Sequence, residues 1–400
     1  MAGYAGLLAE AGWPVTVFSV ANGEDGGSVR LDARIRLSQE AGGGWGGFRH
    51  SPGLWRQAEA AGIDLVHSHG LWTDVNRLAG VIARRHGLPH LLAPCGMLAP
   101  GALRRHWWRK VLVRSWFQGR ALREAQCLHA KSLREYGHIR QFGLRNPVAI
   151  IPNAIGLPSA AGRKSKADFR GAYQLRDNTK IVLFLGRLHL VKGLPRLLHA
   201  WGRVQAEEAD KRRQRLARET EAGDRRTERR TGSKEDWRLV LAGPDEGGHQ
   251  RRLESLTSQL GCRDSVGFVG ELDEEQKWGA LAAADLFVMP SDFENFGNAI
   301  VEAMSCAVPV ITTTGTPWEE LSTTGAGWWV APTVEKLAGA LSEARAISDD
   351  QRRAMGERAS QLAERFRPKR IGEDLIQVYQ WLLGSEPRPR CVVLRSQTAE

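Results

Sequence analysis

The stretch ADLFVMPSDFENFGNAIVEAMSCAVPVITTT, Ala284 to Thr314, predicts a strand, a loop, a helix and a second strand in succession. The apolar runs at 285–290 and 309–314 are typical of buried strands. Gly297 and Asn298 can open a helix with a polar start and an apolar body. Two parallel strands joined by a helix are the repeating unit of open α/β sheets. This stretch therefore predicts a parallel α/β fold.

The same alternation of apolar runs and helical stretches continues over most of the 400 residues. Further strands are expected at 14–20, 64–69, 89–94, 126–130 and 147–152 in the first half, and at 180–186, 237–243, 265–270 and 327–331 in the second. A segment rich in Gly, Pro and Ser near residue 155 separates the two series. The chain also exceeds what one hydrophobic core usually holds. We therefore expect two Rossmann-like domains at 1–153 and 154–366, then a helix at 367–384 and an aperiodic tail at 385–400.

The chain opens inside a helical pattern, YAGLLAEAGWP, and passes directly to the strand at 14–20. A Rossmann-like half normally opens with a strand and a Gly-rich turn. We expect the first domain to lack this strand and turn. Two explanations stay open: the reading frame starts upstream, or the polypeptide is a fragment with poor activity.

Composition limits the class of protein. The sequence contains no run of eighteen apolar residues, so it predicts no membrane span. The five cysteines do not have the spacing of a metal site. We expect a cytoplasmic protein with free thiols and no metal. The net charge of +11 fits a nucleic acid, an anionic membrane or a phosphorylated substrate. Nucleic acid is disfavoured because the sequence contains no recognised nucleic-acid-binding module.

Two segments hold much of the positive charge. In Leu103–Glu124, Trp107, Trp108, Trp116 and Phe117 interleave with seven arginines and lysines. This composition is typical of an amphipathic helix at an anionic membrane surface, although a surface helix that packs its aromatic side on its own domain would look the same. The second segment, 207–236, alternates acids and bases, and we expect a solvated helical or disordered insertion without chemistry.

A candidate anion site follows the strand at 180–186. That strand ends in Gly186 and Arg187, and Lys192 comes after a short loop, just before a helix with Pro195 in its first turn. Cations and amides at a helix start suit a phosphate or diphosphate. An exposed Arg and Lys without a ligand is the alternative.

Two acids flank the start of the helix after the 285–290 strand. Glu294 lies on the loop and Glu302 lies more than a turn into the helix. A carboxylate accepts two hydrogen bonds at once and so matches the adjacent hydroxyls of a sugar. The pair therefore suits one elongated ligand with two diols, and amides of the 297–300 turn add phosphate-binding capacity.

In combination these motifs are specific. Together with DLVHSHGLW, IPNAIG, LAGPDEGG, VGFVGEL and GWWV, they make the chain resemble the family-4 retaining glycosyltransferases. The resemblance covers about residues 5 to 384 apart from 207–236, and it is strongest to bacterial enzymes that build exopolysaccharide or lipopolysaccharide. It implies the GT-B fold of two Rossmann-like domains. It also implies a nucleotide-sugar donor, a glycan or lipid-linked acceptor, and neither metal nor cofactor.

The resemblance also implies roles for individual residues. It assigns Arg187 and Lys192 to the donor diphosphate, Glu302 to the ribose and Glu294 to the donor sugar. His69, at the end of the strand at 64–69, could orient the acceptor hydroxyl, or it could simply be satisfied by a neighbouring loop. The full donor-binding set that the resemblance implies is Gly186, Arg187, Lys192, Val269, Leu272, Glu294, Asn295, Phe296, Gly297, Asn298 and Glu302, with Arg187, Lys192 and Glu294 also catalytic. His69 joins the predicted catalytic residues because it ends a strand on the side where ligands bind in open α/β sheets.

The same fold supports other functions. A sugar-nucleotide epimerase would share the fold and the donor, but the FLGRLHLVKG motif favours transfer. A catalytically impaired GT-B-like interaction protein is the main alternative, because the opening strand and turn are absent from the sequence.

Overall fold

The computed structural model describes residues 2–21, 32–41, 43, 50–104, 107–156, 166–221 and 236–394. The chain forms two compact units. The first contains residues 1–155 and 365–400, and the second contains residues 156–364. Each unit is built around parallel strands and is described by itself below.

The second unit is a doubly wound parallel sheet with the order β12-β11-β10-β7-β8-β9. Its six strands are β7 (Thr179–Leu185), β8 (Asp236–Ala242), β9 (Val266–Gly270), β10 (Leu286–Met289), β11 (Val310–Thr313) and β12 (Gly327–Val330). All six were expected from the sequence. The first strand, β7, lies in the middle of the sheet beside β10, so the direction of winding reverses between these two strands. In open α/β sheets, ligands bind outside the carboxyl ends of the strands at this reversal point.

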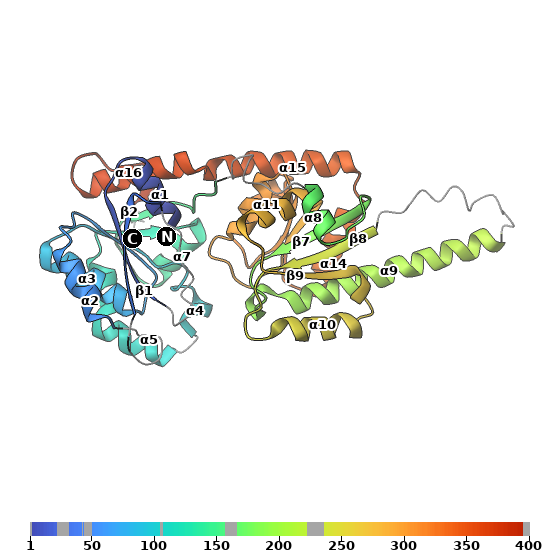
Figure 1. The fold of residues 1–400 in the computed structure, drawn as a ribbon, viewed down its shortest axis with the longest axis horizontal. Helices are drawn as coiled ribbons and strands as arrows, with labels where there is room; N and C mark the ends of the chain where they lie inside the picture. The colour runs from blue at the N-terminus through green and yellow to red at the C-terminus, as the bar shows by residue number, and fades with distance from the viewer. Residues whose placement is uncertain are drawn as a thin grey trace, which may run out of the picture. The chain divides into compact units, whose positions relative to one another are not determined.

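Helices cover this sheet (Figure 1). They are α8 (Lys166–Ala172), α9 (Leu194–Glu221), α10 (His249–Gln259), α11 (Glu274–Ala283), α12 (Asn298–Ser305), α13 (Glu320–Thr323), α14 (Val334–Ala346) and α15 (Asp349–Ala363), with short 3-10 turns η3 (Leu190–Lys192) and η5 (Arg263–Ser265). The first part of α9 is buried through Leu197 and Trp201, whereas its far end runs beyond the rest of the unit in Figure 1. The start of the charged segment at 207–236 is therefore helical as far as Glu221, and residues 222–235 lie outside the described part of the chain.

The larger sheet of the first unit has the order β13-β6-β5-β4-β3. Its strands are β3 (Val66–His69), β4 (His90–Ala93), β5 (Cys127–Ala130), β6 (Val148–Ile150) and β13 (Val392–Val393). The first four were expected and are parallel. The expectation that the tail at 385–400 has no ordered structure is wrong at β13, which pairs antiparallel with β6 and buries Val392. Two β-branched residues suffice to extend the exposed edge of an existing sheet.

A separate two-stranded sheet joins β1 (Val15–Ala21) to β2 (Ile35–Ala41) in parallel. The sequence predicted β1 but not β2, because charged and polar residues interrupt the apolar pattern of β2. Within the described residues, no backbone pairing connects β1 to β3. Phe18 of β1 and Val66 of β3 nevertheless pack into the same apolar cluster, which is covered by α2 (Pro52–Ala60) and α3 (Asp74–His86).

The remaining helices of the first unit come from both ends of the sequence. They are α1 (Ala2–Glu10), α4 (Pro100–Arg104), α5 (Trp107–Val113), the π-helix η1 (Arg114–Gln118), α6 (Gly119–Glu124), α7 (Leu133–Gln141) and α16 (Pro368–Leu382). Tyr4 and Leu8 of α1 share a core with Leu375 and Val378 of α16, and Figure 1 shows the two helices together. The segment 103–124 is helical, as expected, but it is not one regular α-helix. Residues 107–124 form a continuous helical run in which the π-helical stretch η1 joins α5 to α6. Leu103 and Arg104 end α4, and residues 105 and 106 lie outside the described part.

Candidate active site

The candidate site lies at the carboxyl ends of β7 and β10, where glycines allow three backbone segments to come close together. A Cβ atom on Gly243 would lie 2.0 Å from the carbonyl oxygen of Gly186. Gly193, with φ +67°, approaches Pro290 so closely that a Cβ atom would lie 2.2 Å from the Pro290 carbonyl oxygen. A side chain at either position would therefore push the loops apart. These contacts bring Lys192 beside the loop that follows β10.

Lys192 and Glu294 form a direct ion pair. The Lys192 Nζ atom lies 2.5 Å from Glu294 Oε1, and the Ser291 hydroxyl donates a hydrogen bond of 2.8 Å to the same oxygen. The two charged side chains are only 15% and 14% exposed. The Glu294 backbone N–H also donates to Gly315 O at 3.0 Å, which fixes the loop. The structure thus joins the cation predicted for the diphosphate and the acid predicted for the sugar.

Arg187 is more open than Lys192. Its guanidinium is 2.6 Å from Glu246, and the two side chains are 58% and 47% exposed. Exposed ion pairs of this kind contribute at most about 1 kcal/mol, so water or a ligand can replace Glu246 with little loss. Arg187 is therefore able to turn toward a bound anion.

The loop and helix around the second acid have the predicted form. Gly297 caps α12 with φ +86°, the helix begins at Asn298, and Glu302 lies on its second turn. Phe296 is different from the surrounding loop residues, because its ring is buried against Trp318 and its carbonyl oxygen accepts a 2.5 Å hydrogen bond from the Trp318 indole. The Phe296 side chain therefore belongs to the core, and any contact with a ligand must come from its backbone.

Lys277 of α11 is a site residue that the sequence analysis missed. Its Nζ atom lies 3.0 Å from Glu302 Oε1 and 2.8 Å from Glu274. Burial disfavours the charge on Lys277, but the two carboxylates outweigh that cost and raise its pKa. Glu302 is only 15% exposed, so Lys277 is its counterion and fixes its orientation. A nearly buried carboxylate needs a counterion, and the burial of Glu302 is visible only in the folded structure.

The end of β9 contributes backbone atoms. The Val269 carbonyl oxygen lies 3.5 Å from the Tyr173 hydroxyl, at the limit of a hydrogen bond. Leu272 lies in the short connection from β9 to α11, three residues past Val269. Both side chains are partly exposed. The two residues predicted to seat a nucleotide base thus lie at the end of β9 and in the connection that follows it.

His69 belongs to the first unit, where it joins a group of aromatic side chains. Its ring stacks on Tyr4 at 5.9 Å and lies 4.2 Å from the His67 ring. Burial, followed by the neighbouring His129, lowers the pKa of His69 well below its ordinary value. His69 is therefore neutral near pH 7, and a neutral imidazole can accept a hydrogen bond from a hydroxyl group.

A hydrogen-bonded chain of side chains runs beside His69. The Tyr379 hydroxyl of α16 is 2.8 Å from His67 Nδ1, His67 Nε2 is 3.1 Å from His129 Nδ1, and His129 Nε2 is 2.8 Å from Ile151 O. Because the Ile151 carbonyl can only accept, each neutral imidazole donates toward Ile151 and accepts from the Tyr379 side. This chain ties α16 to β3 and β5.

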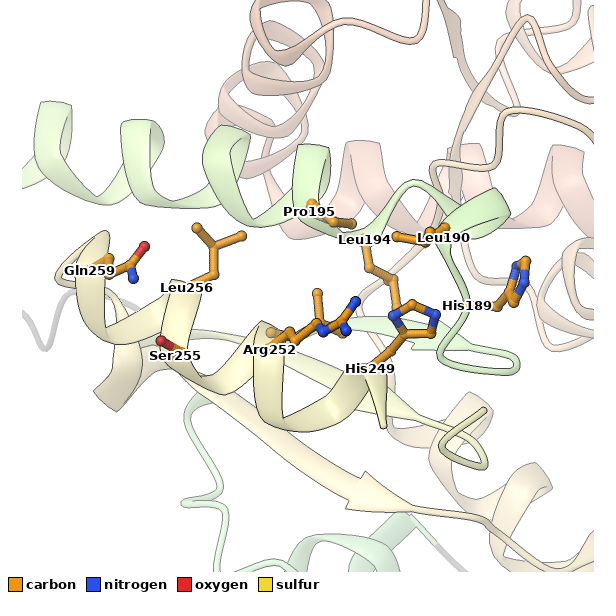
Figure 2. Close-up of a pocket in the computed structure, with 10 residues that line it drawn as sticks. His189, Leu190, Leu194, Pro195, His249, Arg252, Ser255, Leu256 and Gln259 are labelled. Atoms are coloured by element: carbon orange, nitrogen blue, oxygen red, sulfur yellow. The ribbon is translucent and has the colours of Figure 1, made fainter. Parts of the chain in front are cut away.

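A hollow of about 250 Å³ lies on the second unit between the start of α9 and α10 (Figure 2). Leu190, Leu194 and Leu256 give it an apolar lining, and the rings of His189 and His249 are 5.8 Å apart at one end. Of the predicted donor-binding residues, all of which the structure describes, none lines this hollow. It is therefore separate from the site formed by Lys192, Glu294 and Glu302.

Within the described ranges, no three His, Cys, Asp or Glu side chains converge in a way that could hold a metal ion. No helix in the described part of the chain combines the length and apolar character needed to cross a membrane.

Comparison with known families matches both units. Residues 1–154 match the family described as "Glycosyl transferase 4-like domain", and residues 165–362 match "Glycosyl transferases group 1". The chain belongs to the group 1, GT4-like glycosyltransferases. Members of this family transfer sugars from nucleotide sugars, and the GT-B fold expected from the sequence is confirmed.

Curated relatives match parts of the chain. The lipopolysaccharide core biosynthesis mannosyltransferase LpsB of Rhizobium meliloti is 34% identical over 134 residues, which is 32% of this chain and 37% of that protein. A D-inositol 3-phosphate glycosyltransferase of Streptomyces scabiei is 28% identical over 271 residues, covering 67% of this chain and 54% of that protein. The matched stretches thus span between about a third and about half of these relatives' lengths.

Solved structures share the fold over nearly the whole glycosyltransferase chain. Sucrose-phosphate synthase from Thermosynechococcus elongatus superposes with a TM-score of 0.71 at 21% identity, covering 96% of this chain and 92% of that one. WaaG, a glycosyltransferase involved in lipopolysaccharide biosynthesis, gives a TM-score of 0.67 at 17% identity, with 94% of each chain covered. Anabaena HepE, solved in complex with UDP and glucose, gives 0.63 at 19% identity, with 87% and 86% covered.

Proposed function

We propose that the protein is a retaining, metal-independent hexosyltransferase. It takes a sugar from a nucleoside-diphosphate sugar bound by the second unit and transfers it to a glycan or lipid-linked acceptor. The observation that carries this proposal is the arrangement of two acids and two cations at the reversal point of the second sheet. Membership of the glycosyltransferase family supports the reaction class, and the UDP in the HepE structure supports a nucleotide donor.

In this proposal the cations act on the leaving group. Lys192 leaves Glu294 to contact the diphosphate, and Arg187 leaves Glu246. As the bond from the anomeric carbon to the phosphate oxygen breaks, negative charge grows on that oxygen, and fixed positive groups lower the barrier. Such preorganised charge contributes about 3–4 kcal/mol per removed donor in enzymes where it has been measured.

The acids hold the two ends of the donor. Glu302, oriented by Lys277, accepts hydrogen bonds from the ribose diol, and Glu294 accepts them from hydroxyls of the sugar. Backbone groups of residues 295–298 contact sugar and phosphate, and backbone groups of Val269 at the end of β9 and of Leu272 just after it seat the base. The acceptor hydroxyl attacks on the face from which the phosphate departs and gives its proton to that phosphate, which retains the anomeric configuration without a protein nucleophile. His69 orients the hydroxyl.

The proposed pathway is bacterial surface polysaccharide synthesis, as in exopolysaccharide or lipopolysaccharide. The relative LpsB and the structural neighbour WaaG, both named for lipopolysaccharide synthesis, support this choice. A cytoplasmic location fits the five cysteines, none of which forms a disulfide in the described part of the chain.

A thermal-shift panel of UDP, GDP and ADP and their sugars tests the donor site. At a ligand concentration of 100 Kd, binding adds about 2.7 kcal/mol to the stability of the folded state, which is a measurable shift in Tm. We expect one nucleotide to stabilise the parent protein, and Arg187→Ala and Glu302→Ala to reduce the shift. If none of the three nucleotides stabilises the parent, the proposal fails. A strict requirement for manganese would overturn its metal-independent part.

The alternative is a catalytically impaired GT-B-like interaction protein. The separation of the β1–β2 pair from the larger sheet of the first unit favours it, since no backbone pairing joins β1 to β3 among the described residues. Nucleotide binding without hydrolysis or transfer of the donor sugar would support this alternative.

A further inference from the structure

A cluster of exposed apolar side chains lies on the first unit, in the connection from β4 to β5. Eleven large hydrophobic side chains are exposed in the described chain, and five of them lie in one ten-residue stretch of this connection. Their exposed fractions lie between 50% and 64%, and they are Trp107, Trp108, Val111, Leu112 and Trp116. The alternative left open by the sequence, that these tryptophans pack on their own domain, is therefore wrong.

The cluster forms one continuous face. Trp107 and Val111 are four residues apart, and so are Trp108, Leu112 and Trp116, so the two rows lie side by side along α5 and η1. Figure 1 shows α5 at the rim of the first unit. Three tryptophans alone offer several hundred Å² of apolar surface, which monomeric proteins rarely leave exposed without a partner.

Positive charge surrounds this face and is not balanced from within the segment. Between residues 103 and 123 there are seven arginines and lysines and no acidic residue. Arg104 and Arg109 are exposed, and the Arg109 guanidinium lies 5.0 Å from the centre of the Trp108 ring. The first acid is Glu124, which pairs with Arg120 at 2.7 Å. We call the five apolar residues with Arg104 and Arg109 the aromatic–basic face.

We propose that the aromatic–basic face binds an anionic lipid bilayer. Tryptophan rings prefer the headgroup level of a membrane, and arginines beside them can reach lipid phosphates. Val111 and Leu112, which lie between the tryptophans, fit the upper acyl region. A single-stranded nucleic acid would also stack on tryptophan, but it gains nothing from these aliphatic side chains.

The aromatic–basic face shares no residue with the donor site of the second unit. Its link to the proposed function is that α4 follows the end of β4 at the same edge of the sheet where His69 ends β3. A membrane at the aromatic–basic face would hold a lipid-linked acceptor near the first unit. This link rests on the proposed function, whereas the bilayer contact does not.

Co-sedimentation of the full chain with lipid vesicles tests the proposal. We expect binding to vesicles of phosphatidylcholine mixed with phosphatidylglycerol, and much weaker binding to phosphatidylcholine alone. Binding should weaken as salt rises from ~0.1 M to ~1 M, where the Debye length falls from about 10 Å to about 3 Å. Equal binding to both kinds of vesicle would contradict the role of the anionic headgroups.

Two variants separate the apolar and basic contributions. Trp107→Ala with Trp108→Ala should abolish sedimentation with the anionic vesicles, while the fold stays intact because both side chains are exposed. Arg104→Gln with Arg109→Gln should weaken binding about thirty-fold, since each cation near an anionic surface contributes about 1 kcal/mol.

A matched control tests whether net charge alone explains the binding. Arg212 and Arg213 are exposed on α9 of the second unit, so Arg212→Gln with Arg213→Gln removes the same charge from a different surface. This control should bind vesicles as the parent does, and all variants should keep the parent's nucleotide-induced shift in Tm. The proposal is overturned if the control loses as much affinity as the Arg104 and Arg109 variant. It is also overturned if the tryptophan variant still binds, or if the chain binds oligouridylate RNA and not vesicles.

Discussion

The ion pair between Lys192 and Glu294 should contribute to the stability of the second unit and, separately, to donor binding. Breaking a fully buried pair by removing one partner costs about 3–5 kcal/mol. Here each side chain keeps about one-seventh of its surface exposed, so water can partly solvate the remaining charge. We therefore expect Lys192→Met or Glu294→Gln alone to cost about 2–3 kcal/mol. The double variant leaves no buried charge and should regain about 2 kcal/mol of that loss.

Differential scanning fluorimetry of the parent, both single variants and the double variant measures this coupling. For a unit of this size, a loss of 1 kcal/mol lowers Tm by roughly 2–4 °C, so each single variant should lose about 5–10 °C. Glu246→Gln is the matched control, because it breaks the exposed pair with Arg187. Its Tm should change by no more than about 3 °C.

Nucleotide binding in the same four proteins separates stability from function. If Lys192 binds the diphosphate, the double variant regains Tm but does not regain affinity for the nucleoside diphosphate, measured by calorimetry. Strictly additive losses of Tm would show that the pair is not coupled. Full recovery of nucleotide affinity in the double variant would refute the role of Lys192 as a diphosphate ligand.

Two more predictions follow from buried charges. Lys277→Met should weaken nucleotide binding by about tenfold, or roughly 1.4 kcal/mol, because Glu302 loses the cation that orients it. Lys277→Arg keeps the cation and should bind the nucleotide nearly as the parent does. Equal titration curves for the parent and Lys277→Met would contradict this role of Lys277. Burial lowers the pKa of His129 to about 4, so the unfolded chain binds its proton more tightly between pH 6.5 and pH 4. Stability that is present above pH 6.5 should therefore be lost as the pH falls toward 4, by about 3 kcal/mol for this histidine. Hydrogen exchange on heating measures the Tm of the first unit. This Tm should fall as the pH is lowered, and it should fall less in His129→Gln than in the parent. An equal fall in both proteins would contradict the role of His129.

The sequence predicted β1 and all strands of the two larger sheets except β13, because each of these is a short apolar run that ends at Gly, Pro or a polar loop. That pattern follows from burial between two layers of helices and does not depend on the rest of the fold. It fails for β2, where exposed charged and polar residues such as Arg36 and Gln39 interrupt the apolar run. It also fails for β13, whose two residues are too few to form a recognisable pattern.

The sequence predicted those parts of the candidate site whose residues are close to one another along the chain. The loop after β10, the glycine cap of α12 and the position of Glu302 follow from residues 290–302 alone. The counterion of Glu302 did not follow, because Lys277 is 25 residues away on another helix. The buried packing of the Phe296 ring also depends on Trp318, which no local pattern indicates.

Sequence alone therefore determined the α/β class and the family, since these are recorded in local periodicity and spacing. It also predicted the residues that would bind a diphosphate and two diols. Only the tertiary structure decided which charges neutralise one another: Lys192 with Glu294 across 102 residues, and Lys277 with Glu302. It also decided that Trp107 and Trp108 face outward. Charge pairing and exposure depend on distance in space and on access to water, and the chain fixes both only when its strands and helices have packed together.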